Sequence, residues 1–294
     1  MRIGMAAALG LVTAALAAPS AFQSRDVVAL EAADCARLNM MFGDFQVGRA
    51  SQHATVPMSA GTLDVQPPGN GGVQIEKGAG REYSVTACIA AGAANRSEAQ
   101  QLADAVRLRI SGNRVGVENV GAARSWSVQI VIEVPDGGSV DAETTNGPIS
   151  ISGVSGRFTA RAANGPIALD DVNGQVTARA SNGPISVSGS RGDIDAATTN
   201  GPISVLLKGS RWDGRLDARA SSGPLQVTVP SDYRSGVEIS SRGGSPWECR
   251  AAACRDGSRD WDRNSRSLRV GPDPVVVRIS TVNGPVTVDD SRRR

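Results

Sequence analysis

Residues 144–187 have the sequence TTNGPISISGVSGRFTARAANGPIALDDVNGQVTARASNGPISV, in which one pattern recurs every 18 residues. The tripeptide Asn-Gly-Pro begins at Asn146, Asn164, Asn182 and Asn200. A variant that begins at Ser222 and a last copy at Asn283 continue the series. A fixed period of this length is typical of repeat architectures, so the repeat, rather than the total length of 294 residues, decides the fold.

Two short segments of alternating apolar and polar residues follow each of these turns. In the first repeat they are residues 149–152 and 158–162. Alternation with period two predicts β-strands that bury one face, so we expect Ile149 and Ala160 to point inward and Arg161 to point outward. The first strand of each repeat offers large apolar side chains and the second mostly alanine, a combination that fills a narrow interior without overpacking.

Two architectures fit a repeat of two strands and two turns. In a meander, Asn-Gly would form hairpins and neighbouring strands would run antiparallel. In a β-solenoid, each repeat would make one coil, and equivalent residues would stack about 4.8 Å apart. The proline after each glycine removes a backbone donor where a hairpin strand would begin, and the outward Arg161, Arg179 and Arg219 recur at one coil position. These observations favour the solenoid.

Stacked coils would also stack the turn asparagines into a structural amide ladder. Its members would be Asn146, Asn164, Asn182 and Asn200. The predicted fold class is all-β, a single-chain β-solenoid of 18-residue two-strand coils with one short helix and a C-terminal disulfide-loop insertion. We expect a signal peptide at residues 1–18, irregular β coils at 19–135, the regular solenoid at 136–230, and an insertion loop with a final coil at 231–294.

One short helix is expected within the irregular coils, at residues 97–107. Ser97-Glu98-Ala99-Gln100 matches a capping box, and apolar residues from Ala99 to Val106 share one face. The helix would cover the open end or the flank of the stack, because an uncovered sheet edge promotes aggregation. The strand patterns around it are residues 63–65, 73–75, 83–89, 115–117 and 127–134.

The first residues predict export from the cytoplasm. Arg2 precedes an apolar stretch at residues 5–18, and Ala15-Leu16-Ala17 supplies the small residues of a signal-peptide cleavage site. The stretch is shorter than the roughly 20 apolar residues of a membrane anchor. We therefore expect cleavage, no transmembrane segment after cleavage, and a location in the periplasm or at the cell surface.

Four cysteines in an exported chain predict two disulfides, for which three pairings exist. Proximity in the sequence favours Cys35 with Cys88 and Cys249 with Cys254, although the sequence alone does not choose among the pairings. A metal site of four thiolates is the alternative, but the chain has no CxxC pair and no histidine near the cysteines.

Charge and composition disfavour several classes of function. The 31 basic and 29 acidic residues nearly cancel, so no overall field attracts nucleic acid. The one histidine, His53, disfavours zinc hydrolases and Ser/His/Asp catalysis, which need imidazole as ligand or base. We expect no enzyme activity, no cofactor and no metal site.

A carbohydrate-active enzyme on a β-helix is the alternative. Its carboxylate pairs would be Asp170 with Asp171, Asp193 with Asp195, and Asp289 with Asp290. These pairs fall at corners or on outward faces without a converging base, so we interpret them as solvated turn residues.

The signal peptide, the strand-rich lead-in with a helix, and the glycine-punctuated repeat quoted above resemble the bacterial putative-adhesin family, exported β-strand-repeat proteins of unknown function. The resemblance covers residues 61–207 well and the C-terminal third poorly. It implies a β-solenoid in the cell envelope or outside the cell, and its motif is structural, with no catalytic residues to carry over. The function we expect is a non-enzymatic, adhesin-like or envelope-scaffold role for an extended surface, whose partner would be a cell-surface glycan, peptidoglycan or an envelope protein. A purely structural envelope or signalling accessory remains an alternative.

The aromatic residues outside the regular coils are candidates for surface recognition, because they could stack on sugar rings beside arginines that bind acidic groups. The candidates are Trp212, Tyr233, Trp247, Trp261, Arg250 and Arg263. The alternative is that they form a local core for the disulfide loop or cap the last coil. Asp260 to Asn264 is similar to the start of a calcium-binding EF-hand loop, but Ser265 stands where that loop needs glycine.

Overall fold

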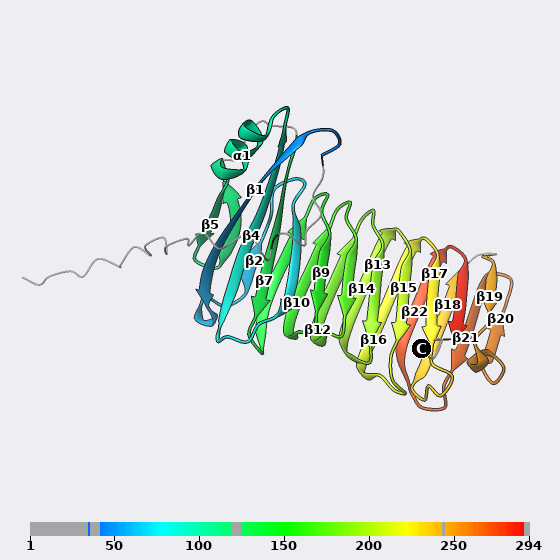
Figure 1. The fold of residues 1–294 in the computed structure, drawn as a ribbon. Helices are drawn as coiled ribbons and strands as arrows, with labels where there is room; N and C mark the ends of the chain where they lie inside the picture. The colour runs from blue at the N-terminus through cyan, green and yellow to red at the C-terminus, as the bar shows by residue number, and fades with distance from the viewer. Residues whose placement is uncertain (1–34, 36–41, 119–124, 243–244, 291–294) are drawn as a thin grey trace, which may run out of the picture.

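The computed structural model describes Cys35 and residues 42–118, 125–242 and 245–290. The predicted signal peptide, residues 1–18, lies outside the described residues. The described chain is mostly β-strand, with one α-helix, α1 (Arg96–Ala105), and two 3-10 turns, η2 (Met58–Ala60) and η3 (Ala252–Cys254). Its strands form two sheets around a continuous hydrophobic core in an elongated molecule (Figure 1).

The first sheet contains eleven strands of the described chain. In spatial order they are β1 (Gln46–Pro57), β4 (Glu82–Ala93), β7 (Trp126–Val134), β3 (Gly72–Lys77), β9 (Ile149–Ser152), β11 (Ile167–Asp170), β13 (Ile185–Gly189), β15 (Ile203–Leu207), β17 (Leu225–Val229), β23 (Val286–Asp290) and β19 (Trp247–Cys249). Strand spacing of about 4.8 Å makes this sheet about 50 Å long.

The second sheet contains twelve strands of the described chain. In spatial order they are β20 (Ser258–Trp261), β21 (Ser265–Val270), β18 (Gly236–Arg242), β22 (Val275–Asn283), β16 (Asp213–Ser222), β14 (Arg191–Asn200), β12 (Asn173–Ala180), β10 (Ser155–Ala162), β8 (Gly138–Thr144), β2 (Leu63–Val65), β6 (Arg114–Glu118) and β5 (Arg107–Ser111).

The regular repeats stack in parallel with the predicted register. In the twelve-stranded sheet, β10 pairs with β12 so that Phe158 lies opposite Val176 and Ala160 opposite Ala178. The strands of the repeats, β8 to β17, alternate between the two sheets along the chain. Each repeat therefore adds one strand to each sheet. We call such a pair of strands a rung. The meander is wrong, because the repeat strands pair in parallel with the next repeat rather than antiparallel with their chain neighbours.

As predicted, the first strand of each repeat buries large apolar side chains, and the second buries mostly alanine. Ile149, Ile151 and their equivalents in the eleven-stranded sheet are buried. The facing positions of the twelve-stranded sheet carry a column of alanines with no exposed surface. The column consists of Ala142, Ala160, Ala178, Ala196 and Ala218. Large side chains from one sheet therefore fill the space left by alanine in the other, at the density of a normal protein core.

The predicted asparagine ladder is confirmed and is one residue longer. Asn164, Asn182 and Asn200 each donate a side-chain hydrogen bond of 3.1 Å to the asparagine of the preceding rung. Asn146 in turn donates to Asn70, at 3.3 Å, in the turn between β2 and β3. The irregular coil that contains β2 and β3 therefore carries the same turn as the regular repeats, although no Asn-Gly-Pro marks it.

Glycine is required where neighbouring rungs approach closely at the beginning of strands β10 and β12. A Cβ on Gly174 would lie 2.2 Å from the carbonyl oxygen of Gly156, which is shorter than any contact a real side chain makes. Gly156 itself would place a Cβ 2.0 Å from the oxygen of Gly138, and it has a φ of +148°. No residue with a Cβ fits this column.

The last two strands of the chain lie inside the stack and not at its end. The C-terminal β22 pairs with β16 on one side and β18 on the other, and β23 lies between β17 and β19. In Figure 1 the red strands accordingly lie between yellow and orange ones. The chain passes over this position after β17, builds the next rung, and returns to fill the gap.

The N-terminal end has the same arrangement. The rung of β2 and β3 lies between the rung of β6 and β7 and the rung of β8 and β9. The chain therefore passes over a filled position as it goes from β7 to β8. We call this arrangement, present at both ends, interleaving.

Residues 231–294 were expected to form an insertion loop with a final coil, but most of residues 231–271 form strands β18, β19, β20 and β21. The strand β18 shows the reason, because Val237 and Ile239 alternate with polar residues and are fully buried. No Asn-Gly-Pro sequence directly precedes β18, so the repeat pattern does not predict this strand. The final coil expected in this segment is present as β22 and β23, but as an inner rung.

The predicted helix is present, and it starts one residue earlier and ends two residues earlier than expected. Asn95, rather than Ser97, is the N-cap, and its side chain accepts a 2.9 Å hydrogen bond from the backbone N–H of Glu98. Ala99 and Ala103 are buried, and the helix packs so closely on β1 that a Cβ on Gly48 would lie 2.2 Å from the backbone of Ala99. The helix covers the flank of the first sheet beside its edge strand.

Candidate binding surface

A long groove crosses the outer surface of the twelve-stranded sheet, along the margin next to the asparagine turns. It has a volume of about 580 Å³ and is lined by residues of β8, β10, β12, β14, β16 and β22. Six strands at the usual spacing give it a length of about 24 Å. The groove therefore runs along the stack and collects one set of side chains from each rung.

Parallel stacking places the outward arginines in one wall of this groove. Arg161 lies between Glu143 of the preceding rung and Arg179 of the next rung. The following rung has Ala197 at this position, and the rung after it has Arg219. Ala162, Ala180 and Ala220 line the groove beside this wall. Its other side has short side chains, and this is why the surface is hollow there. They are Thr145, Ala163, Ser181, Thr199, Ser221 and the exposed Val282.

Aspartates in the neighbouring column hold the arginines in place. Arg161 donates a 2.6 Å hydrogen bond to Asp141, and this bond raises the pKa of the guanidinium. Arg179 binds Asp195, and it also donates to the backbone oxygen of Asp195 at 2.8 Å. We call Arg161, Arg179, Arg219, Asp141, Asp195 and Asp217 the arginine–aspartate row.

Arg219 completes the row with two ion pairs. Its guanidinium lies 2.8 Å from Asp195 and 2.9 Å from Asp217. The arginine side chains are between 40 and 50% exposed, and Asp141 and Asp195 are 38 and 41% exposed, so these groups can be reached from solvent. Asp217 is only 18% exposed. Like charges stacked at the spacing of the rungs repel each other, and the interposed aspartates offset that repulsion.

A second groove, of about 440 Å³, follows the opposite margin of the same sheet. Its floor contains Gly156, Gly174, Gly192 and Gly214. Side chains are excluded there by the close approach of the rungs, so the hollow is a consequence of the turn geometry already described.

Two of the aromatic residues predicted for surface recognition are buried. Trp212 is 5% exposed, and its indole N–H donates to the oxygen of Gly192 at 2.9 Å. Tyr233 is 6% exposed, and burial raises the pKa of its hydroxyl, for which the described residues provide no hydrogen-bond partner. The prediction of surface recognition is wrong for both residues, because the loop after β15 and the loop after β17 fold back onto the core.

Trp247 and Trp261 lie at the C-terminal end of the stack. Their ring centroids are 6.2 Å apart, with Arg266 over the Trp261 ring at 5.2 Å. Trp247 donates a 2.7 Å hydrogen bond to Ser241. Trp261 is 52% exposed. The pair comes from the edge strands of both sheets, which fits the alternative that these aromatics cap the last coil.

The remaining two candidates are exposed arginines near the disulfide loop. Arg250 pairs with Glu248 at 2.6 Å, and this hydrogen bond raises the pKa of the guanidinium. Arg263 is exposed in the turn between β20 and β21. Neither residue contacts the groove. Of the six predicted recognition residues, Trp247 and Trp261 are therefore brought together, but the six do not form one site. The groove was not among the predicted sites.

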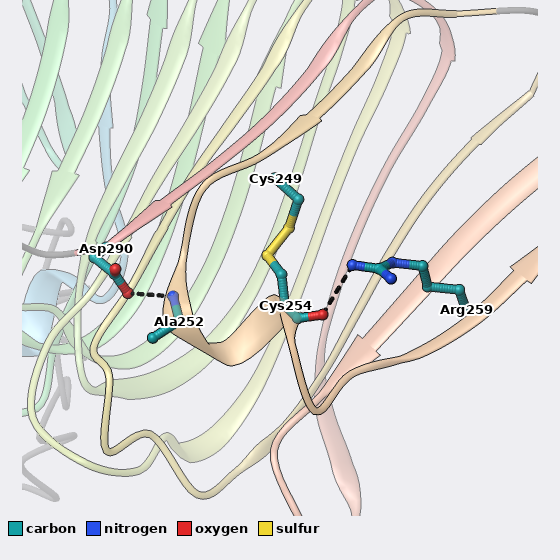
Figure 2. Close-up of a disulfide and its surroundings, with 5 residues drawn as sticks. All are labelled: Cys249, Ala252, Cys254, Arg259 and Asp290. Carbon is teal, nitrogen blue, oxygen red and sulfur yellow. Dashed lines mark hydrogen bonds between the residues drawn. A yellow bond between two sulfur atoms is a disulfide. The ribbon is translucent and has the colours of Figure 1, made fainter.

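Both predicted disulfides are present, Cys35 with Cys88 and Cys249 with Cys254. Figure 2 shows the second, which closes the loop around η3. The loop is fixed further where Asp290 accepts from the N–H of Ala252 and Arg259 donates to the oxygen of Cys254, each at 2.9 Å.

Each of the carboxylate pairs considered for catalysis includes a residue with a structural partner. Lys208 reaches across two rungs to Asp170 and Asp171, at 2.9 and 2.8 Å. The hydrogen bond from Lys208 lowers the pKa of Asp170. Burial lowers the pKa of Lys208, but its hydrogen bonds to the two aspartates outweigh burial, so the net shift is upward. Asp195 belongs to the arginine–aspartate row.

The segment similar to an EF-hand start forms the tight turn between β20 and β21. Asp262 accepts hydrogen bonds of 2.6 Å from the backbone N–H groups of Asn264 and Ser265, and these bonds lower the pKa of its carboxyl. Its carboxylate therefore holds the turn.

Comparison with known proteins gives similarity to solved structures only. No family model matches the chain, and no curated protein matches it. A structure described as a putative adhesin, from Bacteroides fragilis NCTC 9343, is 9% identical with a TM-score of 0.40, covering 83% of this chain and 97% of its own.

Two further structures are similar to the chain. A putative cell adhesion protein from Clostridium sporogenes ATCC 15579 is 10% identical with a TM-score of 0.29, covering 83% of this chain and all of its own. A putative adhesin from Parabacteroides distasonis ATCC 8503 is 11% identical with a TM-score of 0.29, covering 85% and 98%. The function proposed below rests on the surface of this chain.

Proposed function

We propose that this chain is an exported, non-enzymatic, adhesin-like scaffold, a β-solenoid whose outer surface binds an extended partner of the cell envelope or a cell surface. The observation that carries the proposal is the groove across six strands of the twelve-stranded sheet. Its length of about 24 Å suits a chain-like ligand that contacts several rungs at once. Small molecules are usually held in enclosed pockets that bury most of their surface.

The solenoid part of the proposal is supported by the pairing of equivalent residues. Asn146, Asn164, Asn182 and Asn200 are each 18 residues apart and hydrogen-bonded in series. Parallel stacking with a fixed period repeats each surface feature at the strand spacing. A repeated surface of this kind is suited to a partner that is itself a repeating polymer.

Export is supported by the two disulfides, because such bonds persist in oxidising compartments outside the cytoplasm. The helix α1 has ten residues, and no helix in the described part of the chain is long and apolar enough to cross a membrane. The absence of catalysis is proposed because Lys208 binds the Asp170–Asp171 pair and two arginines bind Asp195. A general acid and base would have to be free to exchange protons with a substrate.

The proposal is tested by binding of the purified mature chain to washed bacterial envelopes, purified sacculi and cell-surface polysaccharides. Ser181→Trp should abolish binding, because Ser181 is an exposed groove residue and the indole would fill the groove. Ser186→Trp is the matched control, an exposed serine on the outer face of the other sheet. The proposal is overturned if the wild-type chain binds none of these materials, if both variants bind like wild type, or if the chain cleaves the polymer.

A further inference from the structure

The charges in one wall of the groove are balanced within the arginine–aspartate row. The row contains three arginines and three aspartates, and each arginine has an aspartate within ion-pair distance. Glu143, which lines the groove opposite Arg161, adds one further carboxylate. A balanced row produces little net field, so it does not attract a polyanion as an unpaired arginine cluster would. A polyanion would also have to displace the aspartates that already occupy the guanidinium groups.

The row offers donors and acceptors side by side at fixed positions. A guanidinium carries five N–H donors, more than the two or three bonds that its carboxylate partners accept, and a carboxylate has about four acceptor positions. The bonds within the row hold both groups in place. Hydroxyl groups donate and accept at once, so a ligand rich in hydroxyls can bind both members of each pair without separating them.

The other side of the groove has the same dual character. Ser181, Thr199 and Ser221 are exposed, and each hydroxyl is both a donor and an acceptor. Ala163 and Ala197 also line the groove and are half-buried, whereas Ala162 and Ala180 belong to the core beneath it. The methyl groups of Ala163 and Ala197 can contact the C–H faces of a sugar ring, while the polar groups beside them bind hydroxyls at its edges.

A peptide strand is a poorer fit to this groove. Extended peptides usually add to a sheet edge, where backbone groups are unpaired. The strands under the groove are internal, since β12 pairs with β10 on one side and β14 on the other. Their backbone groups are already used in the sheet, which leaves side chains as the means of recognition.

We propose that the groove binds a neutral, hydroxyl-rich glycan chain that runs along the stack, with the arginine–aspartate row as its recognition set. This inference rests on the proposed function and names the class of partner at the same surface. Arg179 and Arg219 contribute most, because they flank Ala197, where the wall is lowest and both guanidinium groups converge.

The test uses pairs of polymers that share a backbone and differ in charge: dextran with carboxymethyl dextran, and hydroxyethyl cellulose with carboxymethyl cellulose. Affinity electrophoresis of the mature chain should show binding to the neutral member of at least one pair, with little change from low to high salt. Tighter binding of the anionic member, weakened by salt, would overturn the inference, because screening weakens charge-driven contacts.

Substitutions in the row separate hydrogen bonding from charge. Arg179→Lys with Arg219→Lys keeps both charges but removes the planar donor forks, so we expect neutral-glycan affinity to fall about tenfold or more. Arg157→Ala is the matched control, an exposed arginine on the same sheet whose partner is Gln175, outside this groove. Unchanged affinity in the double lysine variant, or an equal loss in the control, would contradict the assignment.

The same experiment separates the inference from the proposed function. If the chain binds envelope material but none of the neutral polymers, the glycan assignment is wrong and the scaffold function stands. If it binds neither, both fail. Circular dichroism and thermal melting of each variant should match the wild type, since all substituted side chains are exposed or half-buried.

Discussion

Arg179 and Arg219, two rungs apart, bind the two oxygens of one carboxylate, Asp195, from opposite sides. Ala197 occupies the arginine position of the rung between them and leaves room for both guanidinium groups to converge. Asp195 is therefore the shared partner of both arginines, and Arg219 has Asp217 as a second partner.

Asp195→Asn should make the groove locally positive around Arg179 and Arg219. Both guanidinium groups lose their shared partner, so binding of carboxymethyl cellulose or carboxymethyl dextran should rise several-fold and become salt-sensitive. The free energy of unfolding should change by less than about 1 kcal/mol, because exposed ion pairs contribute little. Asp193→Asn, an outward neighbour on the same strand, is the control, and an equal gain there would contradict the role of Asp195.

Asn182→Ala should destabilise the stack more than Asn200→Ala. Asn182 donates to Asn164 and accepts from Asn200, whereas Asn200 is the last asparagine of the ladder before Ser222. At about 0.5–1.5 kcal/mol for each hydrogen bond, the inner variant should lose about 1–3 kcal/mol and the outer one about half as much. Urea unfolding measures both. Equal losses would indicate that the ladder does not act through its hydrogen bonds.

Gly174→Ala should be poorly tolerated, while Gly153→Ala should be mild. The new Cβ at position 174 would lie 2.2 Å from the oxygen of Gly156, so two rungs would have to separate, at a cost of about 1–3 kcal/mol or more. Gly153 has a φ of +64° but open space around it, so alanine there costs only backbone strain, about 1–2 kcal/mol. Thermal melting of the two variants compares these costs, and a larger loss at position 153 would refute the packing argument.

Trp212→Ala should destabilise the fold by about 3–5 kcal/mol, as for other buried aromatic residues. The side chain is 5% exposed and its indole N–H is hydrogen-bonded to Gly192. Trp261→Ala, at a residue 52% exposed, should cost much less. Chemical denaturation of both variants checks the expectation. Similar stability of the two would mean that Trp212 is not a core residue.

Acid should weaken the contact between Lys208 and Asp170. The pKa of Asp170 is lowered from its ordinary 3.8, chiefly by the hydrogen bond from Lys208. A carboxyl whose pKa is lower in the folded state stabilises the fold above its ordinary pKa, and this contribution is lost as pH falls through the folded pKa. Below about pH 4 the free energy of unfolding should therefore fall.

Asp170→Asn should reduce that acid-dependent loss by about 0.2–1 kcal/mol, a small amount because the pair is exposed and screened by solvent. Lys208→Met should reduce it similarly, since it removes the main cause of the lowered pKa. Urea titrations at neutral and acidic pH measure the difference. An unchanged loss in both variants would contradict the assignment.

The regular half of the fold could be predicted because each residue in it obeys one period. Ile149 and Ala160 alternate inward, and Asn146 to Asn200 mark each turn, so the local pattern and the tertiary stacking agree. The strand β1 could not be predicted in this way. Its few apolar residues give a weak alternation, and its stability comes from twelve paired residues with β4 and from the overlying helix.

The spatial order of the rungs at the two ends of the stack also could not be predicted from the sequence pattern. The repeat at Asn283 shows that a coil resumes, but nothing local specifies which neighbour it joins. The recurrence of Arg161, Arg179 and Arg219 in the sequence indicates both stacking of the repeats and a row of arginines on one surface. Only the first of these two indications enters the prediction. Trp212 and Tyr233 misled the prediction because aromatic residues in a loop are not thereby exposed.

Interleaving restricts how such a chain could change in length. Its first and last rungs in sequence are enclosed by others, so a repeat appended at either terminus would find no free neighbour of the regular kind. New 18-residue units could enter only between β8 and β17, each extending the groove by about 4.8 Å while both terminal structures stay intact. Homologues with longer or shorter binding surfaces should thus differ in the middle of the gene and not at its ends.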